Sequence, residues 1–474
     1  MDRAHTLSAF LALAVCSLVL LLGLAYAPSA YAQSKPSIKA LFSFACDPNT
    51  KVCPDGEQPN TLFQSADGNF YGTTTTGGTG NKAAGTVFKI TPGGPLTTIY
   101  TFVSDQNGNY PNGGTPHSLV EGNDGYLYGT AGGGANNTGL VFRLSKGGRM
   151  QALNSAVGAG PSVLVLGRDG NLYGGTFGNN AVGGTLFRVT PSGSYTLLHT
   201  FNRTVEGPMA LGMTLASDGN LYGTTLGGEE LLTTLFRLTP SGQFTILHSF
   251  HYAQFPVGAP VQASNGQLYA AMSRFEDEAK PGMFASSLSG AGFKQFSLPF
   301  AFGDAVPYMT QASDSNLWSI LFGSDVNEEV ISLSPNGKLL QTITFDSANG
   351  ELPNAPLIQG SDGRLFGVTQ GGGSVQQGEV ASGVVFELDA GLAAPKPSLA
   401  GFNPSRGKAG TQVMIYGNRF VGTTAVTFNG VSTTFRVLNT GNILATVPQG
   451  ATIGPIAVRN PGGTATSKRS FTVD

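Results

Sequence analysis

A seven-residue segment, "SDGNLYG" at residues 217–223, constrains the fold of this chain more than any other feature because it recurs. It joins an Asp-Gly turn to an apolar-aromatic pair, and related copies begin at residues 66, 123, 168, 217, 264, 313 and 361. The acid or amide positions are separated by 57, 45, 49, 47, 49 and 48 residues. Asp-Gly between apolar segments is a hairpin signal, and a repeat of this period indicates a propeller or a solenoid.

Three more segments recur in step with the turn. In the fourth repeat they are "MTLAS" (213–217), "TLFRLTP" (234–240) and "FTILHSF" (244–250). Four short strand-like segments, repeated seven times, are typical of propeller blades.

The two ends of the repeat array complement each other. "IKALFSF" (38–44) precedes the first repeat, whereas the last repeat stops after "VVFELDA" (384–390) without a fourth strand. Pairing these ends would remove an exposed sheet edge. We therefore predict an all-β fold in which residues 33–390 form a seven-bladed β-propeller closed by its N-terminal strand.

The turn, the "TLFRLTPSG" strand and the "LHSF" ending together resemble the bacterial GloVer tandem repeats of exported choice-of-anchor proteins. The layout also resembles NHL-type propellers, in which the strand before the Asp-Gly turn lines the central channel. This resemblance covers about residues 38–390. It implies an exported propeller and supplies no catalytic residues.

A different pattern follows a linker predicted at residues 391–398. "NPSRGKAGTQVMIYGNRF" (403–420) and "ATVPQGATIGPIAVRNPGG" (445–463) resemble an IPT/TIG domain. Alternating apolar strands with Gly and Pro turns independently support a small immunoglobulin-like β-sandwich over residues 399–474. Because related domains occur in surface proteins, polysaccharide-active enzymes and DNA-binding factors, this module does not select a function.

Residues 1–32 are typical of a secretory signal peptide, with cleavage after Ala32. An uncleaved membrane anchor is the alternative. Cleavage would leave no membrane span and would place the protein in the periplasm, at the cell surface or in the medium. Only Cys46 and Cys53 would then remain, and we predict a disulfide between them rather than a metal site.

Charge differs sharply between the two parts of the chain. Residues 33–394 hold 17 Lys/Arg and 26 Asp/Glu, whereas residues 395–474 hold 8 Lys/Arg and one acid. Propeller topology would gather acidic loops on one face, and these acids are Glu229, Glu230, Glu276, Asp277, Glu278, Asp325, Glu328 and Glu329. They could bind Ca²⁺ or a basic partner, or they could simply be solvated loops. We expect the basic C-terminal domain beside or below the last blade, away from these acids.

Catalytic sequence motifs are missing: we find no G-x-S-x-G, H-E-x-x-H or phosphate-binding loop. The strands expected to line the channel are mostly apolar or carry glutamine, namely Gln64, Gln262, Gln311 and Gln359. His117 and Glu121 are the only obvious candidates there for acid–base chemistry, and a structural role is the alternative.

The preferred interpretation is an exported, non-catalytic scaffold or binding protein whose loops meet a glycan or protein. We expect a monomer with no cofactor and no nucleic-acid partner. The alternative is a propeller enzyme, such as a polysaccharide lyase or a lactonase-like hydrolase, with a site in the channel.

The repeated polar and aromatic residues are interpreted as structural. Asp218 is expected to shape its turn, because Asn265 and Ser315 replace the acid and the glycine in other copies. Tyr222 and its equivalents are expected to pack one blade on the next. Basic residues at one repeat position are expected to bond between blades, and these are Lys89, Arg143, Arg188 and Arg237.

Overall fold

The structure is a computed structural model, and every described element is a β-strand. The described residues are 36–80, 82–134, 138–154, 160–178, 183–226, 232–250, 254–274, 281–300, 306–322 and 328–474. The signal-peptide prediction falls outside these ranges. Within them, no helix is long and apolar enough to cross a membrane.

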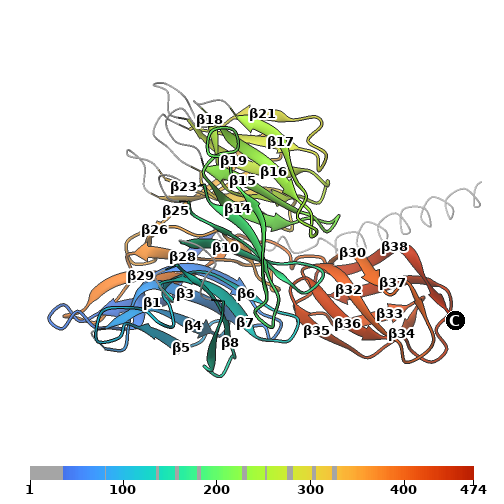
Figure 1. Ribbon diagram of the computed structural model, residues 1–474, viewed down its shortest axis with the longest axis horizontal. Helices are drawn as coiled ribbons and strands as arrows, with labels where there is room; N and C mark the ends of the chain where they lie inside the picture. Colours follow the sequence, from blue (N-terminus) through green and yellow to red (C-terminus); the bar gives the residue numbers. More distant parts are fainter. Residues whose placement is uncertain are drawn as a thin grey trace, which may run out of the picture. The chain divides into compact units, whose positions relative to one another are not determined.

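Each of the first six repeats forms one antiparallel four-stranded sheet in sequence order (Figure 1). Repeat 1 contains β2 (Cys53–Gln64), β3 (Phe70–Gly78), β4 (Ala83–Ile90) and β5 (Leu96–Val103). Repeat 2 contains β6 (Gly114–Glu121), β7 (Leu127–Gly132), β8 (Leu140–Leu144) and β9 (Met150–Asn154). Repeat 3 contains β10 (Pro161–Leu166), β11 (Leu172–Thr176), β12 (Thr185–Val189) and β13 (Tyr195–Thr200).

The next three repeats follow the same order. Repeat 4 contains β14 (Met209–Leu215), β15 (Leu221–Leu226), β16 (Thr233–Leu238) and β17 (Phe244–Phe250). Repeat 5 contains β18 (Gln254–Gln262), β19 (Leu268–Arg274), β20 (Gly282–Ser286) and β21 (Lys294–Ser297). Repeat 6 contains β22 (Met309–Gln311), β23 (Leu317–Leu321), β24 (Glu329–Leu333) and β25 (Leu339–Thr344).

The sheet of repeat 7 joins the two ends of the array. Its first strand is split into β26 (Glu351–Pro353) and β27 (Ile358–Gln359), followed by β28 (Leu365–Gly371) and β29 (Val380–Asp389). The N-terminal strand β1 (Ser37–Cys46) supplies the fourth strand and pairs with β29, with Ile38 opposite Leu388. The predicted pairing of the displaced strand is therefore confirmed.

The C-terminal segment forms two sheets around its own core. One contains β30 (Ser398–Asn403), β32 (Gln412–Asn418), β36 (Asn442–Thr446) and β35 (Phe435–Asn439). The other contains β31 (Arg406–Gly407), β38 (Gly463–Val473), β37 (Gly454–Asn460), β33 (Ala425–Phe428) and β34 (Val431–Ser432). Val413, Ile443 and Phe471 are fully buried between them, as expected for a β-sandwich.

The "LYG" part of the repeat explains how one sheet packs internally and on the next. A Cβ at Gly223 would lie 2.3 Å from the Phe236 ring, so glycine leaves room for an aromatic side chain of the third strand. The preceding Tyr222 is fully buried in a cluster with Leu268 and Phe284 of repeat 5. Successive sheets therefore share apolar cores, as the sequence predicted.

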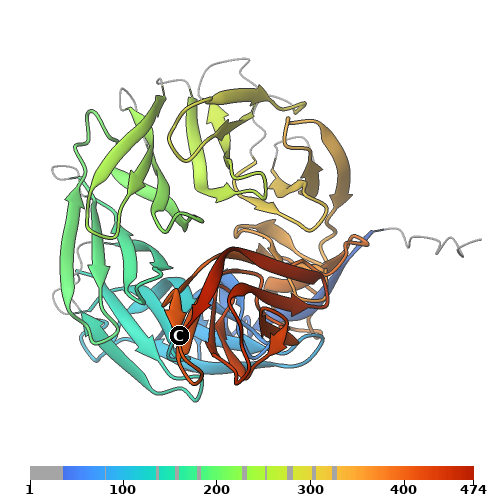
Figure 2. The same cartoon turned by 90° about the vertical axis from the view of Figure 1, so that its right-hand side faces the viewer.

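The last sheet packs on the first in the same way. Phe366 of repeat 7, which corresponds to Tyr222, lies in a buried cluster with Phe70 and Phe88 of repeat 1. Phe366 and Phe70 have ring centroids 4.3 Å apart. In Figure 2 the colours of the sheets pass from blue through green to orange from one sheet to the sheet beside it. We call the contact between repeats 7 and 1 the seam.

Candidate functional site

The turn that opens the sequence motif is held together by its own side chains. Asp218 Oδ1 accepts a hydrogen bond from the Asn220 amide at 3.0 Å. Its Oδ2 lies 2.8 Å from the Tyr222 hydroxyl, which is also 3.0 Å from the Leu288 carbonyl oxygen of repeat 5. Burial and the Asp218 carboxylate raise the pKa of Tyr222, so its hydroxyl remains a donor. Asp218 thus orients the turn and the tyrosine.

The same arrangement recurs with different atoms. Asp67, Asp124 and Asp169 accept from their own tyrosine hydroxyls at 2.7–2.9 Å. In repeat 5 the direction is reversed, because Asn265 Nδ2 donates to the Tyr269 hydroxyl oxygen. In repeat 6 the indole of Trp318 donates to Asp314. Whether the residue is an acid or an amide, it forms a hydrogen bond with the aromatic side chain four positions on.

The predicted channel glutamines instead connect neighbouring turns. Gln262 Oε1 accepts from the Ser217 amide at 2.7 Å, and its Nε2 donates to Ser217 Oγ at 3.0 Å. The corresponding Ser N–H to Gln Oε1 distances are 2.7 Å (Ser264 to Gln311), 2.9 Å (Ser313 to Gln359) and 3.0 Å (Ser361 to Gln64). We call these contacts Ser–Gln junctions, and one of them crosses the seam.

Glu121 takes the glutamine position between repeats 1 and 2. Its side chain is 3% exposed and accepts from Ser65 Oγ and the Ala66 amide, each at 2.8 Å. Lys146 Nζ lies 2.7 Å from Glu121 and 3.2 Å from Asp67, which neutralises the buried charge. The sequence analysis did not single out Lys146, although it stands where Pro92, Pro191 and Pro240 occupy the corresponding repeat position.

The other acid–base candidate, His117, does not meet Glu121. The two residues are four apart on β6, which is about 13 Å along an extended strand. Burial lowers the pKa of His117, so the neutral imidazole is favoured. The structure therefore does not bring the two predicted channel residues together as a catalytic pair.

The repeated basic residues bond within their own sheets rather than between sheets. Arg143 donates to Asp124 at 2.9 Å and stacks over the Tyr126 ring at 3.6 Å. Arg188 and Arg237 lie 3.4 and 3.5 Å from the hydroxyls of Thr196 and Thr245 on the adjacent strand. The expected bonding between blades is therefore not seen for these three residues: Arg143 binds the turn before β7, and Arg188 and Arg237 contact the fourth strand of their own sheets.

The predicted acidic face is only partly described. Glu229, Glu230, Glu276, Asp277, Glu278 and Asp325 lie outside the described residues. Glu328 and Glu329 are half-buried at the start of β24, at the end of the sheet opposite the repeat turn. Thr344 donates to Glu329 at 3.3 Å, so this carboxylate has a structural partner.

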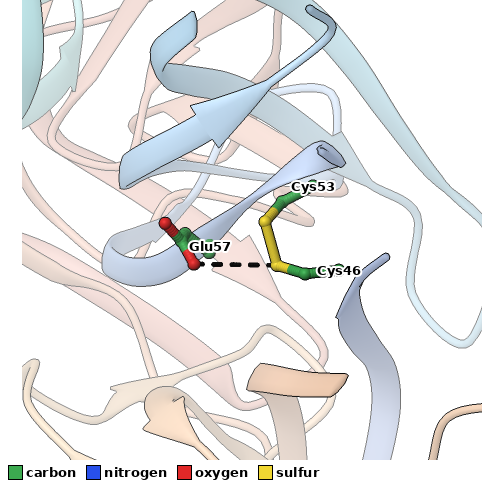
Figure 3. Close-up of side chains that lie close together, drawn as sticks. All are labelled: Cys46, Cys53 and Glu57. Atoms are coloured by element: carbon green, nitrogen blue, oxygen red, sulfur yellow. Dashed lines mark hydrogen bonds between the residues drawn. A yellow bond between two sulfur atoms is a disulfide. The ribbon is translucent and has the colours of Figure 1, made fainter. Parts of the chain in front are cut away.

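Cys46 and Cys53 form a disulfide, with an S–S distance of 1.99 Å (Figure 3). It connects the end of β1, in the sheet of repeat 7, with the start of β2 in repeat 1. The dashed line joins Cys46 Sγ and a Glu57 carboxylate oxygen, 3.6 Å apart. Because the two sulfurs are bonded to each other, neither is a thiolate that could bind a metal.

The C-terminal domain contacts the repeat turns, and the two parts belong to one compact unit, Ser37–Asp474. Asn439 and Asn442 donate to Asn123 Oδ1 at 2.9 and 2.7 Å. Arg419 donates to the Gln311 carbonyl oxygen at 2.7 Å. A cavity of about 260 Å³ lies beside Asn123. Its lining includes Asp67, Glu121, Asn123 and Lys146 from the turns and Arg436, Val437 and Leu438 from the domain.

Two family models match the chain. Residues 58–285, from β2 to β20, match the Gloeobacter/Verrucomicrobia repeat, and residues 397–473 match the IPT/TIG domain. The chain carries Gloeobacter/Verrucomicrobia repeats followed by an IPT/TIG domain. The resemblance to the Gloeobacter/Verrucomicrobia repeats is thereby confirmed over residues 58–285, and the resemblance to an IPT/TIG domain over residues 397–473. We call the C-terminal domain the TIG domain below. No curated protein matches the chain.

Solved structures give a likeness of fold. A fungal alcohol oxidase of the AA5 family, in complex with copper, is 12% identical with a TM-score of 0.50, over 89% of this chain and 98% of that chain. An extracellular domain of a one-component system from B. thetaiotaomicron is 13% identical with a TM-score of 0.48. That match covers 79% of this chain and 46% of the other, so this chain spans less than half its length. At these identities the likeness concerns the fold alone.

Proposed function

We propose that the protein is an exported, non-catalytic scaffold or binding protein that presents its loops to an extracellular glycan or protein. The observation that carries this proposal is how the repeat turns use their polar groups. Asp218 and its equivalents bind tyrosine hydroxyls, the glutamines bind neighbouring turns, and Glu121 is neutralised by Lys146. These groups hold the repeats together. The residues that would bind a partner are therefore expected in the loops that differ between repeats, because binding residues are commonly found in loops.

We infer that the seven sheets close into a propeller. Pairing of β1 with β29, packing of Phe366 on Phe70, and the Ser361–Gln64 junction all support closure at the seam. A crystal structure of residues 33–474 tests this directly. Seven sheets around one axis are expected, whereas an open array with an unpaired β29 edge would contradict closure.

The proposed binding face is the end of the repeats opposite the turns, where the acidic loops of repeats 4 to 6 belong. Clustered carboxylates there suit a basic partner or Ca²⁺. A titration of the mature protein with Ca²⁺, with Mg²⁺ as the control, tests the second option. A Ca²⁺-specific rise in melting temperature is expected for a bound ion, and equal small effects of both ions would contradict it.

Glycan-array binding by residues 33–474, followed by affinity measurement on any hit, tests the main proposal. The loop variant replaces eight acids by their amides: Glu229, Glu230, Glu276, Asp277, Glu278, Asp325, Glu328 and Glu329. The matched variant, Lys468→Gln with Arg469→Gln, changes exposed charge on the TIG domain instead. Loss of binding in the loop variant alone is expected.

Two results would contradict the proposal. Loss of binding only in the TIG variant would place the binding surface on the other domain. Turnover of a polysaccharide or a lactone that His117→Ala abolishes would instead establish an enzyme with a site on β6.

A further inference from the structure

Two junctions between repeats carry leucine in place of glutamine and a longer polar side chain in place of serine. Between repeats 2 and 3, Asn123 stands at the serine position and Leu166 at the glutamine position. Between repeats 3 and 4, the corresponding residues are Arg168 and Leu215. Leucine cannot accept a hydrogen bond, so neither junction can form the contact seen between repeats 4 and 5.

At both of these junctions the residue that replaces serine contacts the TIG domain. Asn123 Oδ1 accepts hydrogen bonds from Asn439 and Asn442, whose side chains lie on the β35–β36 hairpin and are 5% and 6% exposed. The guanidinium carbon of Arg168 lies over the Tyr416 ring, 5.8 Å from its centroid, and Arg168 donates to the Ser217 carbonyl oxygen of repeat 4 at 2.6 Å. Arg168 therefore joins repeat 3 to repeat 4 and to the TIG domain.

Other TIG contacts lie on the opposite side of the seam. Arg419 donates to Gln311 of repeat 6, and burial lowers the pKa of Arg419. Ser313 Oγ, also in repeat 6, donates to the Ala393 carbonyl oxygen in the linker at 2.7 Å. Buried Asn460 donates to the carbonyl oxygens of Pro395 and Arg419, which fixes the linker to the domain. The TIG domain thus binds repeats 2 and 3 on one side of the seam and repeat 6 on the other.

We propose that the TIG domain acts as an internal brace of the repeat array, bridging the seam and replacing the Ser–Gln contact at the two junctions where leucine stands in place of glutamine. Its partner is the turn face of its own chain, recognised through an asparagine acceptor, an arginine–tyrosine stack and backbone carbonyls. This leaves the opposite face for other partners. The inference does not depend on what the loops bind.

The first test measures docking by hydrogen exchange and mass spectrometry on the full mature chain. Asn123→Ser shortens the acceptor and leaves two buried amide donors unpaired. Unpaired buried donors weaken an interface enough to raise its open fraction about tenfold. Peptides spanning the 435–446 hairpin should therefore exchange about tenfold faster in this variant.

The second test asks whether docking stabilises the repeats. Trp318 is the only tryptophan of the chain and is buried in repeat 6, so its fluorescence during urea unfolding reports on the repeats rather than on the TIG domain. Asn123→Ser should lower the urea midpoint. Adding Leu166→Gln supplies a Ser–Gln pair and should restore the midpoint while the hairpin stays fast-exchanging.

Gln262→Leu provides the matched control, because it removes a Ser–Gln contact between repeats 4 and 5. It should lower the midpoint and leave exchange in the 435–446 hairpin unchanged. Unchanged hairpin exchange in Asn123→Ser would overturn the assigned docking contact. Faster exchange with an unchanged Trp318 midpoint would show that the domain docks without bracing the repeats.

Discussion

Two of the contacts that join neighbouring repeats at their turns differ in chemistry. Between repeats 5 and 6 the contact is neutral, with Gln311 Oε1 accepting from the Ser264 amide and its Nε2 donating to the Ser315 carbonyl oxygen. Between repeats 1 and 2 it is ionic, with Glu121 bound by Lys146 as well as by the turn of repeat 1.

The first strand of one repeat can therefore bind the turn of the preceding repeat without a charged side chain. A neutral amide satisfies the turn by itself, whereas a buried carboxylate needs a cation brought from elsewhere. The ionic junction should therefore be more sensitive to loss of one partner and to acid.

The largest expected effect comes from Lys146→Met. It removes the cation and leaves Glu121 buried without a counter-charge, which should lower the free energy of unfolding by about 3 kcal/mol. Urea unfolding followed by Trp318 fluorescence measures the change. The double variant Lys146→Met with Glu121→Gln should recover most of the loss, because it converts the junction to the neutral kind. No recovery would show that Lys146 acts through contacts other than Glu121.

Gln311→Leu should have a smaller effect on the neutral junction. It leaves the Ser264 amide without its acceptor, and one unsatisfied buried donor costs about 1–2 kcal/mol. The same urea titration applies. A loss as large as that of Lys146→Met would mean that the two kinds of junction do not differ in energy.

Acid should affect the ionic junction selectively. Burial alone would raise the pKa of Asp67, but hydrogen bonds from Tyr71 and the Asn69 amide, together with Lys146, lower it overall. The unfolded chain then binds a proton before the folded one does, so this stabilisation is present above about pH 3.8 and is lost as the pH falls below it. Melting temperatures at pH 5 and pH 3 should differ less in Asp67→Asn than in the parent protein. Equal differences in melting temperature in the two proteins would show that Asp67 does not contribute to the acid sensitivity.

The smallest effect is expected for Asp218→Asn. Repeat 5 already carries Asn265 in this place, with the hydrogen bond to tyrosine reversed, so the change should stay within about 0.5 kcal/mol. Asp218→Ala removes the Tyr222 contact and should cost about 1 kcal/mol. If the two variants were equally damaging, the turn would need a carboxylate after all.

Much of the fold could be predicted, because a turn or strand signal that is weak in one repeat recurs at the same position in the others. One "SDGNLYG" is ambiguous, but seven copies locate the turns, the strands that follow them and the aromatic residues that pack on the next sheet. The displaced strand at residues 38–44 predicted the pairing with β29, because an unpaired edge is unfavourable.

The candidate site was harder to predict. Gln64 and its equivalents were expected on the strands that line the channel. The period alone does not say that their amides bind the neighbouring turn, because it does not show which neighbour a side chain reaches. The TIG contact had a sequence signal that was not used. Asn123 with Leu166, and Arg168 with Leu215, are paired departures from a regular pattern.

The sequence by itself therefore determined the strands, the turns, the order of the repeats and the presence of a TIG domain, because these follow from local chemistry repeated at a fixed period. Only the tertiary structure decided that Lys146 neutralises Glu121 and that the TIG domain binds the turns at Asn123 and Arg168. These contacts join residues tens to hundreds of positions apart. Their partners are selected by distance and burial in the folded chain, which no local pattern encodes.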